Sequence, residues 1–400
     1  MFSWLARMAL FCLRPMRRYG RMNRDDDDNN DDHDDTDGDS SADSLLWSRE
    51  LERLSFGDFS MAVVQANEVL EDHSQVETGN GAVFVGVYDG HGGPEASRYI
   101  SDHLFSHLMR VSREKGVISE ETLRAAFSAT EEAFLTLVRR TCDLKPLIAA
   151  VGSCCLVGVI WKGTLLIANV GDSRAVLGSM GNNNNNNNNS RSNKIVAEQL
   201  TSDHNAALEE VRQELRSLHP DDSQIVVLKH GVWRVKGIIQ VSRSIGDAYL
   251  KRPEFSLDPS FPRFHIPERL QRPVLSAEPC VYTRVLQTSD KFVIFASDGL
   301  WEQMSNQQAV EIVNKHPRPG IARRLVRRAM SIAAKKREMR YDDLKKVERG
   351  VRRFFHDDIT VVVIFIDTEL LMVEKATVPE LSLKGFSHTV GPSKFSIFFS

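Results

Sequence analysis

The chain has 400 residues, of which 42% are hydrophobic, the ordinary share for a soluble globular protein. Its formal net charge of −3 does not favour binding to nucleic acid or to an anionic membrane through an overall field. No apolar run reaches the roughly 18–20 residues that a membrane-spanning helix needs. The apolar stretch 1–13 is broken by Arg7 and lacks a cleavage-site pattern, so we expect no secretory signal.

The five cysteines show neither a disulfide framework nor the spacing of a zinc site. Cys154 and Cys155 lie together in an apolar run, which predicts two buried thiols in the core. An odd number of cysteines without a framework is typical of a reducing compartment. We therefore expect an intracellular protein.

The N-terminal 44 residues divide into two segments of different composition. Residues 1–24 combine apolar side chains at helical spacing with six arginines, which predicts an amphipathic helix for an anionic membrane surface. A frayed terminus is an equally open interpretation. Residues 25–44 are rich in aspartate and predict a disordered acidic linker. A folded domain is then expected over 45–367, followed by a peripheral tail over 368–400.

Alternating strand-like and helical patterns fill the region from residue 45 to residue 367. Runs rich in Val, Ile and Phe predict strands at 61–66, 83–88, 154–161, 165–170, 292–296 and 359–366. Apolar residues at helical spacing predict helices at 94–113, 120–140, 206–218, 306–314 and 321–333. Ser305 and Gln308 form a capping box at the start of the fourth helix. The asparagine run 182–189 is expected in a surface loop.

A basic segment extends over residues 315–353. Such a segment can be a nuclear-localisation or nucleic-acid patch. The alternative is a solvated helix face, which is the commoner case. Because no aromatic residues alternate with the charges here, we expect no specific nucleic-acid partner.

Acidic residues stand where predicted strands meet loops, in four short groups: Glu71-Asp72, Asp89-Gly90-His91, Asp298-Gly299 and Asp357-Asp358. Each group by itself is an ordinary turn signal. Together they predict a cation site, since neighbouring carboxylates raise one another's pKa unless a metal offsets their charge. Oxygen ligands without clustered Cys or His select Mg²⁺ or Mn²⁺. Two such ions can clamp a phosphoryl group.

Six motifs make the indication specific: YDGHGG (88–93), NVGDSRAVL (169–177), LTSDHN (200–205), VSRSIGD (241–247), ASDGLWEQMS (296–305) and HDDITVVV (356–363). In this order they resemble the motifs of the type 2C metal-dependent protein phosphatase family, over roughly residues 60–367. The resemblance implies an α+β fold, in which a sandwich of two antiparallel-rich sheets is flanked by helices. It also implies two Mg²⁺ or Mn²⁺ ions at one end of the sandwich.

The same resemblance implies the metal ligands, with Asp89 bridging the two ions: Glu71, Asp89, the carbonyl of Gly90, Asp298 and Asp357. A water activated by the metals would attack the phosphorus in line, without a phosphoenzyme. Asp72 would orient that water. His91 would protonate the serine or threonine leaving oxygen, and its alternative role is a hydrogen bond to a metal ligand.

Four positions depart from the family pattern or leave a role open. Asp172 and Glu302 match positions that can hold a third ion, but the family more often has Asp at the second, and Asp172 can equally cap a turn. Asn67 occupies the place of an arginine that grips the substrate phosphate, so phosphate binding is expected to be weaker. Arg243, or the stretch 229–236, is a candidate replacement. Asp358 stands where the family commonly has Asn.

Asn67, together with the segments 230–251 and 335–358, resembles one plant subgroup of the family, clade D. That subgroup is linked to dephosphorylation of plasma-membrane proton pumps and to inhibition by small auxin-induced proteins. The resemblance thus implies phosphoprotein substrates, including such a pump, and small protein inhibitors. A monomer is expected, in the nucleus or at the cytoplasmic face of the plasma membrane.

The sequence therefore predicts a hydrolase that removes phosphate from phosphoserine and phosphothreonine in proteins. Asn67 and Glu302 motivate an alternative from another class, in which the same fold is a pseudophosphatase or a partner-binding module.

Overall fold

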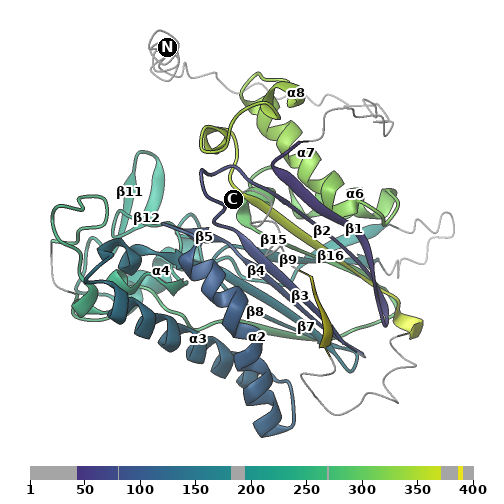
Figure 1. Ribbon diagram of the computed structural model, residues 1–400, viewed down its shortest axis with the longest axis horizontal. Coiled ribbons are helices and arrows are strands. Elements are labelled where there is room, and N and C mark those ends of the chain that lie inside the picture. Colours follow the sequence, from purple (N-terminus) through teal and green to yellow (C-terminus); the bar gives the residue numbers. More distant parts are fainter. Residues whose placement is uncertain (1–42, 80, 182–193, 268–269, 371–385, 391–400) are drawn as a thin grey trace. The chain divides into compact units, whose positions relative to one another are not determined.

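The computed structural model describes residues 43–79, 81–181, 194–267, 270–370 and 386–390 (Figure 1). The predictions for 1–24, for nearly all of the acidic linker, for the asparagine run and for most of the tail lie outside these residues. Within them, no helix is both long enough and apolar enough to cross a membrane.

The first of two large sheets has six strands in the order β1-β2-β16-β15-β9-β10. Every neighbouring pair in it is antiparallel. Its strands are β1 (Leu46–Leu54), β2 (Gly57–Val64), β9 (Arg174–Met180), β10 (Ile195–Gln199), β15 (Asp290–Ala296) and β16 (Ile359–Ile366). The predicted strand 359–366 agrees with β16 at both ends.

The second large sheet has six strands in the order β14-β8-β7-β4-β3-β17, again all antiparallel. Its strands are β3 (His73–Gly79), β4 (Ala82–Tyr88), β7 (Cys155–Trp161), β8 (Thr164–Val170), β14 (Cys280–Val285) and β17 (Phe386–Val390). The predicted strands 83–88, 154–161 and 165–170 correspond to β4, β7 and β8 within one residue at each end.

The two sheets pack face to face, as the side chains of β16 show. Val362 and Ile364 belong to the core cluster between the sheets, which also contains Val85 of β4. Val361 and Val363 belong to the cluster on the opposite face of their sheet. Since successive residues of a strand point to opposite faces, a central strand covered on both sides must be apolar throughout. All eight residues of β16 are buried.

Helices cover the outer face of each sheet (Figure 1). α6 (Asn306–Lys315) and α7 (Ile321–Lys336) pack on the first sheet, and α2 (Glu95–Lys115) and α3 (Glu120–Thr141) pack on the second. The predicted capping box of Ser305 and Gln308 is present at the start of α6. The expected sandwich of two antiparallel sheets between helical layers is confirmed.

Shorter elements surround one end of the sandwich. They are β5 (Gly90–His91), β6 (Gly152–Ser153), β13 (Ile245–Gly246), the hairpin β11 (Val226–Lys229) and β12 (Val232–Val235), α4 (Glu209–Leu218), α5 (Asp298–Trp301) and α8 (Tyr341–Leu344), with 3₁₀ turns at Pro146–Ala150, Ala248–Leu250, Pro253–Phe255 and Arg352–Phe354. Two-residue strands such as β5 carry no sequence signal of their own, and none of the three was predicted.

The folded domain begins before the end of the acidic linker that was predicted over 25–44. The carboxylate of Asp43 accepts two hydrogen bonds from Arg352, at 3.0 and 3.3 Å, and both side chains are buried. Among the other aspartates of the linker, Asp43 is predicted to be solvated. Only its pairing with the distant Arg352 places it in the core.

Candidate active site

The predicted carboxylates gather because strand ends meet at one end of the sandwich. Asp89 follows β4 directly, and Asp298 follows β15 after one residue. Asp357 stands two residues before β16. The antiparallel register pairs Ile359 with Val64 of β2, and Val361 with Ala296 of β15, so these strand ends lie side by side.

Asp358 organises the loop that connects β2 to β3. Its Oδ1 accepts hydrogen bonds from the backbone N–H groups of Ala66 at 2.6 Å and Asn67 at 3.0 Å, and its Oδ2 accepts from that of Glu71 at 2.9 Å. The side chain is buried. Instead of only adding negative charge near the site, Asp358 therefore positions the loop that carries Glu71.

Asn67 bridges two candidate metal ligands. Its Nδ2 donates to Glu71 Oε2 at 3.1 Å and to Asp357 Oδ1 at 3.4 Å. An amide here neutralises no charge, but it holds the two carboxylates in a fixed relation.

Asp72 lies deeper than the candidate metal ligands Glu71, Asp89, Asp298 and Asp357. It is 2% exposed, and its Oδ2 accepts a hydrogen bond from Thr360 Oγ1 at 2.7 Å. Burial, together with the charge of Asp358, raises the pKa of Asp72 well above its usual value.

The carboxylates form one electrostatic cluster. Burial raises the pKa of Asp89 well above the usual range, and the charge of Asp298 is the next largest cause. Burial also raises the pKa of Glu71 to about 7, with Asp358 adding to the effect. It raises that of Asp357 to about 6 against the opposing charge of Arg353. Such a cluster stays ionised at neutral pH only if cations offset it.

Two observations show that the residues fit a cation. Oδ1 of Asp298 is buried and has no hydrogen-bond partner among the described residues, so one acceptor of the cluster is unsatisfied. A Cβ at Gly90 would lie 2.5 Å from the carbonyl oxygen of Glu71, so only glycine lets these two backbones approach. The donor set is all oxygen, which suits a hard divalent ion.

His91 is held by a residue that was not predicted. The small sheet β13-β6-β5 pairs His91 with Gly152 and Gly152 with Gly246, which brings Asp247 beside the imidazole. His91 Nε2 lies 2.8 Å from Asp247 Oδ2, which also accepts from Ser244 Oγ at 2.6 Å. Burial works against protonation of His91, but the charge and hydrogen bond of Asp247 outweigh it and raise its pKa.

Comparison with known proteins shows which family has this arrangement. Residues 55–337 match the model of the family described as "Protein phosphatase 2C". The chain is 92% identical, over the full length of both chains, to "Probable protein phosphatase 2C 68" of Arabidopsis thaliana. It is 66% identical to "Probable protein phosphatase 2C 25" of Oryza sativa subsp. japonica, covering 100% of this chain and 99% of the relative.

The chain belongs to the protein phosphatase 2C family. The two relatives just named are plant proteins, and the chain is a protein phosphatase, as the motifs predicted. Among solved structures it is similar to a serine-threonine phosphatase 2C from Toxoplasma gondii, with a TM-score of 0.56 and 18% identity over 80% of this chain and 99% of the other. At that identity the likeness concerns the fold. The family match ends at residue 337, whereas the sheet of this phosphatase continues through β16.

Asp172 adjoins the carboxylate cluster of the phosphatase: burial raises the pKa of Asp298, and the charge of Asp172 is the next largest cause. Ligand atoms of Asp89, Cys154 and Asp172 lie within 4.8 Å of one another. Both oxygens of Asp172 already have protein partners, since Cys154 Sγ donates to Oδ1 at 3.3 Å and Asn205 Nδ2 to Oδ2 at 2.6 Å. Glu302 is exposed at the end of α5. Cys154 and Cys155 are buried, as predicted, but Cys154 also touches Asp172.

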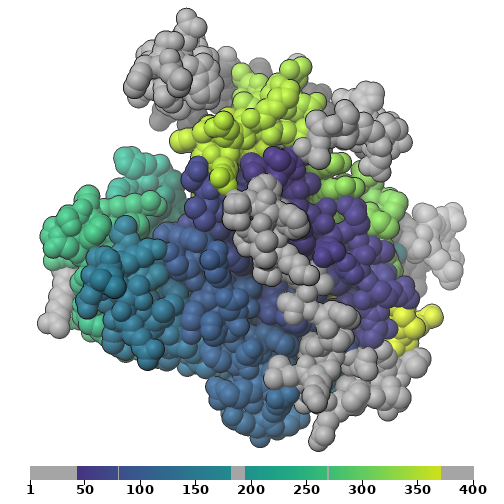
Figure 2. Space-filling view, in the orientation of Figure 1, coloured from purple at the N-terminus to yellow at the C-terminus, as the bar shows by residue number. Residues whose placement is uncertain are grey.

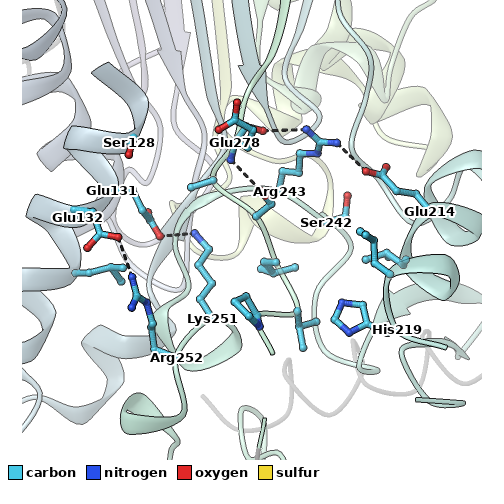
Figure 3. Close-up of a pocket in the computed structure, with 18 residues that line it drawn as sticks. Ser128, Glu131, Glu132, Glu214, His219, Ser242, Arg243, Lys251, Arg252 and Glu278 are labelled. Carbon is cyan, nitrogen blue, oxygen red and sulfur yellow. Dashed lines mark hydrogen bonds and ion pairs between the residues drawn. The ribbon is translucent and has the colours of Figure 1, made fainter. Parts of the chain in front are cut away.

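Arg243 lies away from the carboxylate cluster. It lines a cleft of about 540 Å³ between α3, α4 and the segment 273–278 (Figure 3). Its guanidinium forms an ion pair with Glu214 at 2.8 Å and donates to the carbonyl of Glu278 at 3.0 Å. Its guanidinium is held in this cleft and forms no ion pair with Glu71, Asp89 or Asp357 among the described residues. Its role as a replacement for the arginine missing at position 67 stays a prediction.

Sequence reasoning missed two residues that touch the site, Asp247 and Arg353, and it missed the positioning role of Asp358. For Asp247 the VSRSIGD motif was the available signal, and it was used only to identify the family.

Proposed function

We propose that this phosphatase hydrolyses phosphoserine and phosphothreonine in proteins and that the reaction depends on two Mg²⁺ or Mn²⁺ ions. The proposed ligands are Glu71, Asp89, the carbonyl of Gly90, Asp298 and Asp357. The observation that supports this most is a cluster of buried carboxylates that raise one another's pKa, in which Asp298 Oδ1 has no hydrogen-bond partner among the described residues. When bound, such ions supply positive charge for the phosphoryl oxygens and lower the pKa of a water.

The remaining steps fall to side chains of the chain itself. Asp72, buried behind the ligands, is proposed to orient the attacking water. His91, held by Asp247, is proposed to donate a proton to the serine or threonine oxygen as it leaves. A third ion at Asp172 would have to displace Asn205 or share an oxygen with it, and Glu302 is a long, exposed ligand. Third-ion binding therefore stays a prediction.

A phosphopeptide assay of the full chain tests this function. Phosphoserine and phosphothreonine peptides should be hydrolysed with Mn²⁺ or Mg²⁺, and activity should be lost with EDTA and restored by the metal. Asp298→Asn should reduce kcat by at least about 100-fold, while Asp221→Asn, at an exposed position, should leave it unchanged. Activity that persists in EDTA, or in Asp298→Asn, would contradict the proposal.

The alternative, a pseudophosphatase or partner-binding module, predicts no turnover in that assay with any metal. A proton pump as substrate, small protein inhibitors, a monomeric state and a nuclear or plasma-membrane location stay predictions. The segment 1–24, on which the membrane contact rests, lies outside the described residues.

A further inference from the structure

The basic segment 315–353 reaches the rim of the candidate metal site. The backbone N–H of Gly350 donates to the carbonyl of Ala66 at 2.7 Å, and Arg349 lies 3.9 Å from Glu68. The turn Arg352–Phe354 is therefore beside the loop that carries Asn67 and Glu71. Figure 2 shows this C-terminal part of the domain, in yellow-green, against the purple N-terminal strands.

This turn is anchored from inside the protein. The side chain of Arg352 is fully buried and donates to Asp43, to the carbonyl of Leu344 at 3.4 Å and to that of Lys345 at 3.0 Å. A buried guanidinium with several acceptors fixes the local backbone. Arg353, the next residue, belongs to the same anchored turn, and its side chain is 50% exposed.

Arg353 points its charge at the carboxylate cluster. Its Nη2 lies 2.6 Å from Asp357 Oδ2, on the carboxylate whose other oxygen receives Asn67. In the described part of the chain, no other Lys or Arg forms an ion pair with Glu71, Asp72, Asp89, Asp298 or Asp357. Burial works against the charge on Arg353, but the surrounding acids, Asp357 first, outweigh it and raise its pKa.

The substrate of the proposed reaction makes such a cation necessary. A phosphate monoester carries close to two negative charges at neutral pH. The site holds six carboxylates, and when all are ionised their negative charge exceeds the positive charge of two divalent ions. They are Glu71, Asp72, Asp89, Asp298, Asp357 and Asp358. A dianion must therefore approach an excess of negative charge. A guanidinium has five N–H donors, and one pointing at Asp357 leaves others for phosphoryl oxygens.

We propose that Arg353 binds the substrate phosphate, with its guanidinium shared between Asp357 and the phosphoryl oxygens. This inference rests on the proposed phosphatase function. It assigns the phosphate contact to the turn before β16, on the opposite side of Asp357 from Asn67. The basic segment then acts partly within the active site, where a solvated helix face or a nucleic-acid patch was predicted.

The test compares Arg353→Gln and Arg353→Lys with a matched control, Arg349→Gln. Arg349 lies in the same segment and is similarly exposed, but its weak ion pair is with Glu68. Calorimetry measures the affinity of each full-length variant for Mn²⁺ alone and then, with Mn²⁺ present, for inorganic phosphate. Steady-state kinetics with a phosphothreonine peptide give kcat and KM.

Arg353→Gln should weaken phosphate binding by about 10- to 100-fold and raise KM in proportion. Arg353→Lys should lie between it and the wild type, because a point charge lacks the fork geometry. Arg349→Gln should stay within about twofold of the wild type, and Mn²⁺ affinity should change little in all three.

Unchanged phosphate affinity in Arg353→Gln overturns the inference. So does a parallel fall in Mn²⁺ affinity, which would make Arg353 a positioning residue for Asp357. Should Arg353→Gln fail to fold, Arg353→Lys decides by the same comparison. If the wild type binds phosphate through Arg353 yet hydrolyses no phosphopeptide, the proposed function fails while the phosphate contact stands.

Discussion

Asp247 accepts a hydrogen bond from His91 across 2.8 Å, although 156 positions separate the two residues in the chain. The contact depends on Gly152, since a Cβ there would lie 2.1 Å from Asp247 Oδ2 and 2.5 Å from His91 Nε2. Asp247 itself has a left-handed backbone, with φ of 48°, which few residues other than Gly, Asn and Asp adopt readily. This conformation orients its carboxylate toward the imidazole.

Asp247→Asn should slow hydrolysis of a phosphoserine peptide by about 10- to 100-fold, because neutral asparagine no longer favours the protonated imidazole that donates to the leaving oxygen. An aryl phosphate such as p-nitrophenyl phosphate has a leaving oxygen that needs no proton, so its kcat should fall much less. His91→Gln should show the same contrast, more strongly. Equal losses on both substrates would indicate that the pair only maintains the structure.

Asp358→Ala should reduce the free energy of unfolding by about 2 kcal/mol, since three backbone N–H groups lose their shared acceptor. It should also weaken Mn²⁺ binding by about 10-fold or more, because Glu71 is no longer positioned. Urea unfolding and metal calorimetry measure the two effects. Asp358→Asn, which retains one acceptor oxygen, should lose less in both. A variant that keeps wild-type metal affinity would remove the positioning role assigned to Asp358.

Metal binding should stabilise the folded chain. At 100 times its dissociation constant, Mn²⁺ should add about 2.7 kcal/mol to the free energy of unfolding, and EDTA should remove this gain. Asp298→Asn should abolish the gain and, in EDTA, should be at least as stable as the wild type, because it removes one member of a mutually repelling cluster. Thermal unfolding with and without Mn²⁺ measures both. A metal-free Asp298→Asn protein much less stable than the wild type would contradict the repulsion on which this argument rests.

His204 should make the fold sensitive to acid. It is 3% exposed, and burial, with the charge of Arg243, lowers its pKa from 6.5 to about 4. The unfolded chain then binds a proton between these pH values that the folded chain does not. The stability from the neutral ring is complete above pH 6.5 and is lost as pH falls toward 4, up to about 3 kcal/mol.

Urea unfolding in EDTA at pH 7.5 and pH 5 measures this effect for the wild type and His204→Gln. Glutamine does not titrate, so the wild type should lose more stability between the two pH values than the variant does. Taking the difference cancels other buried groups, such as His356, whose pKa is also lowered to about 4. Equal losses in the two proteins would show that His204 titrates normally.

The sequence by itself determined the fold class and which acidic residues gather at one end of the sandwich. Apolar runs such as Ile359–Ile366 are long and uniform enough to require a strand buried on both faces. Asp89, Asp298 and Asp357 stand within two residues of such runs, so their gathering follows from where strands end. The six motifs in their order also identified the family, whereas each acidic turn by itself could not.

Only the tertiary structure decided which side chains contact those acidic residues. Asp247 reaches His91 through two-residue strands, and Arg352 finds Asp43 at a distance of 309 positions. These contacts leave no periodic pattern, because hydrophobic periodicity reports which face of an element is buried and not which charge it meets. For the same reason Arg243 and Arg353 look alike in sequence, yet the first is bound in a cleft by Glu214, whereas the second reaches Asp357 at the rim of the site.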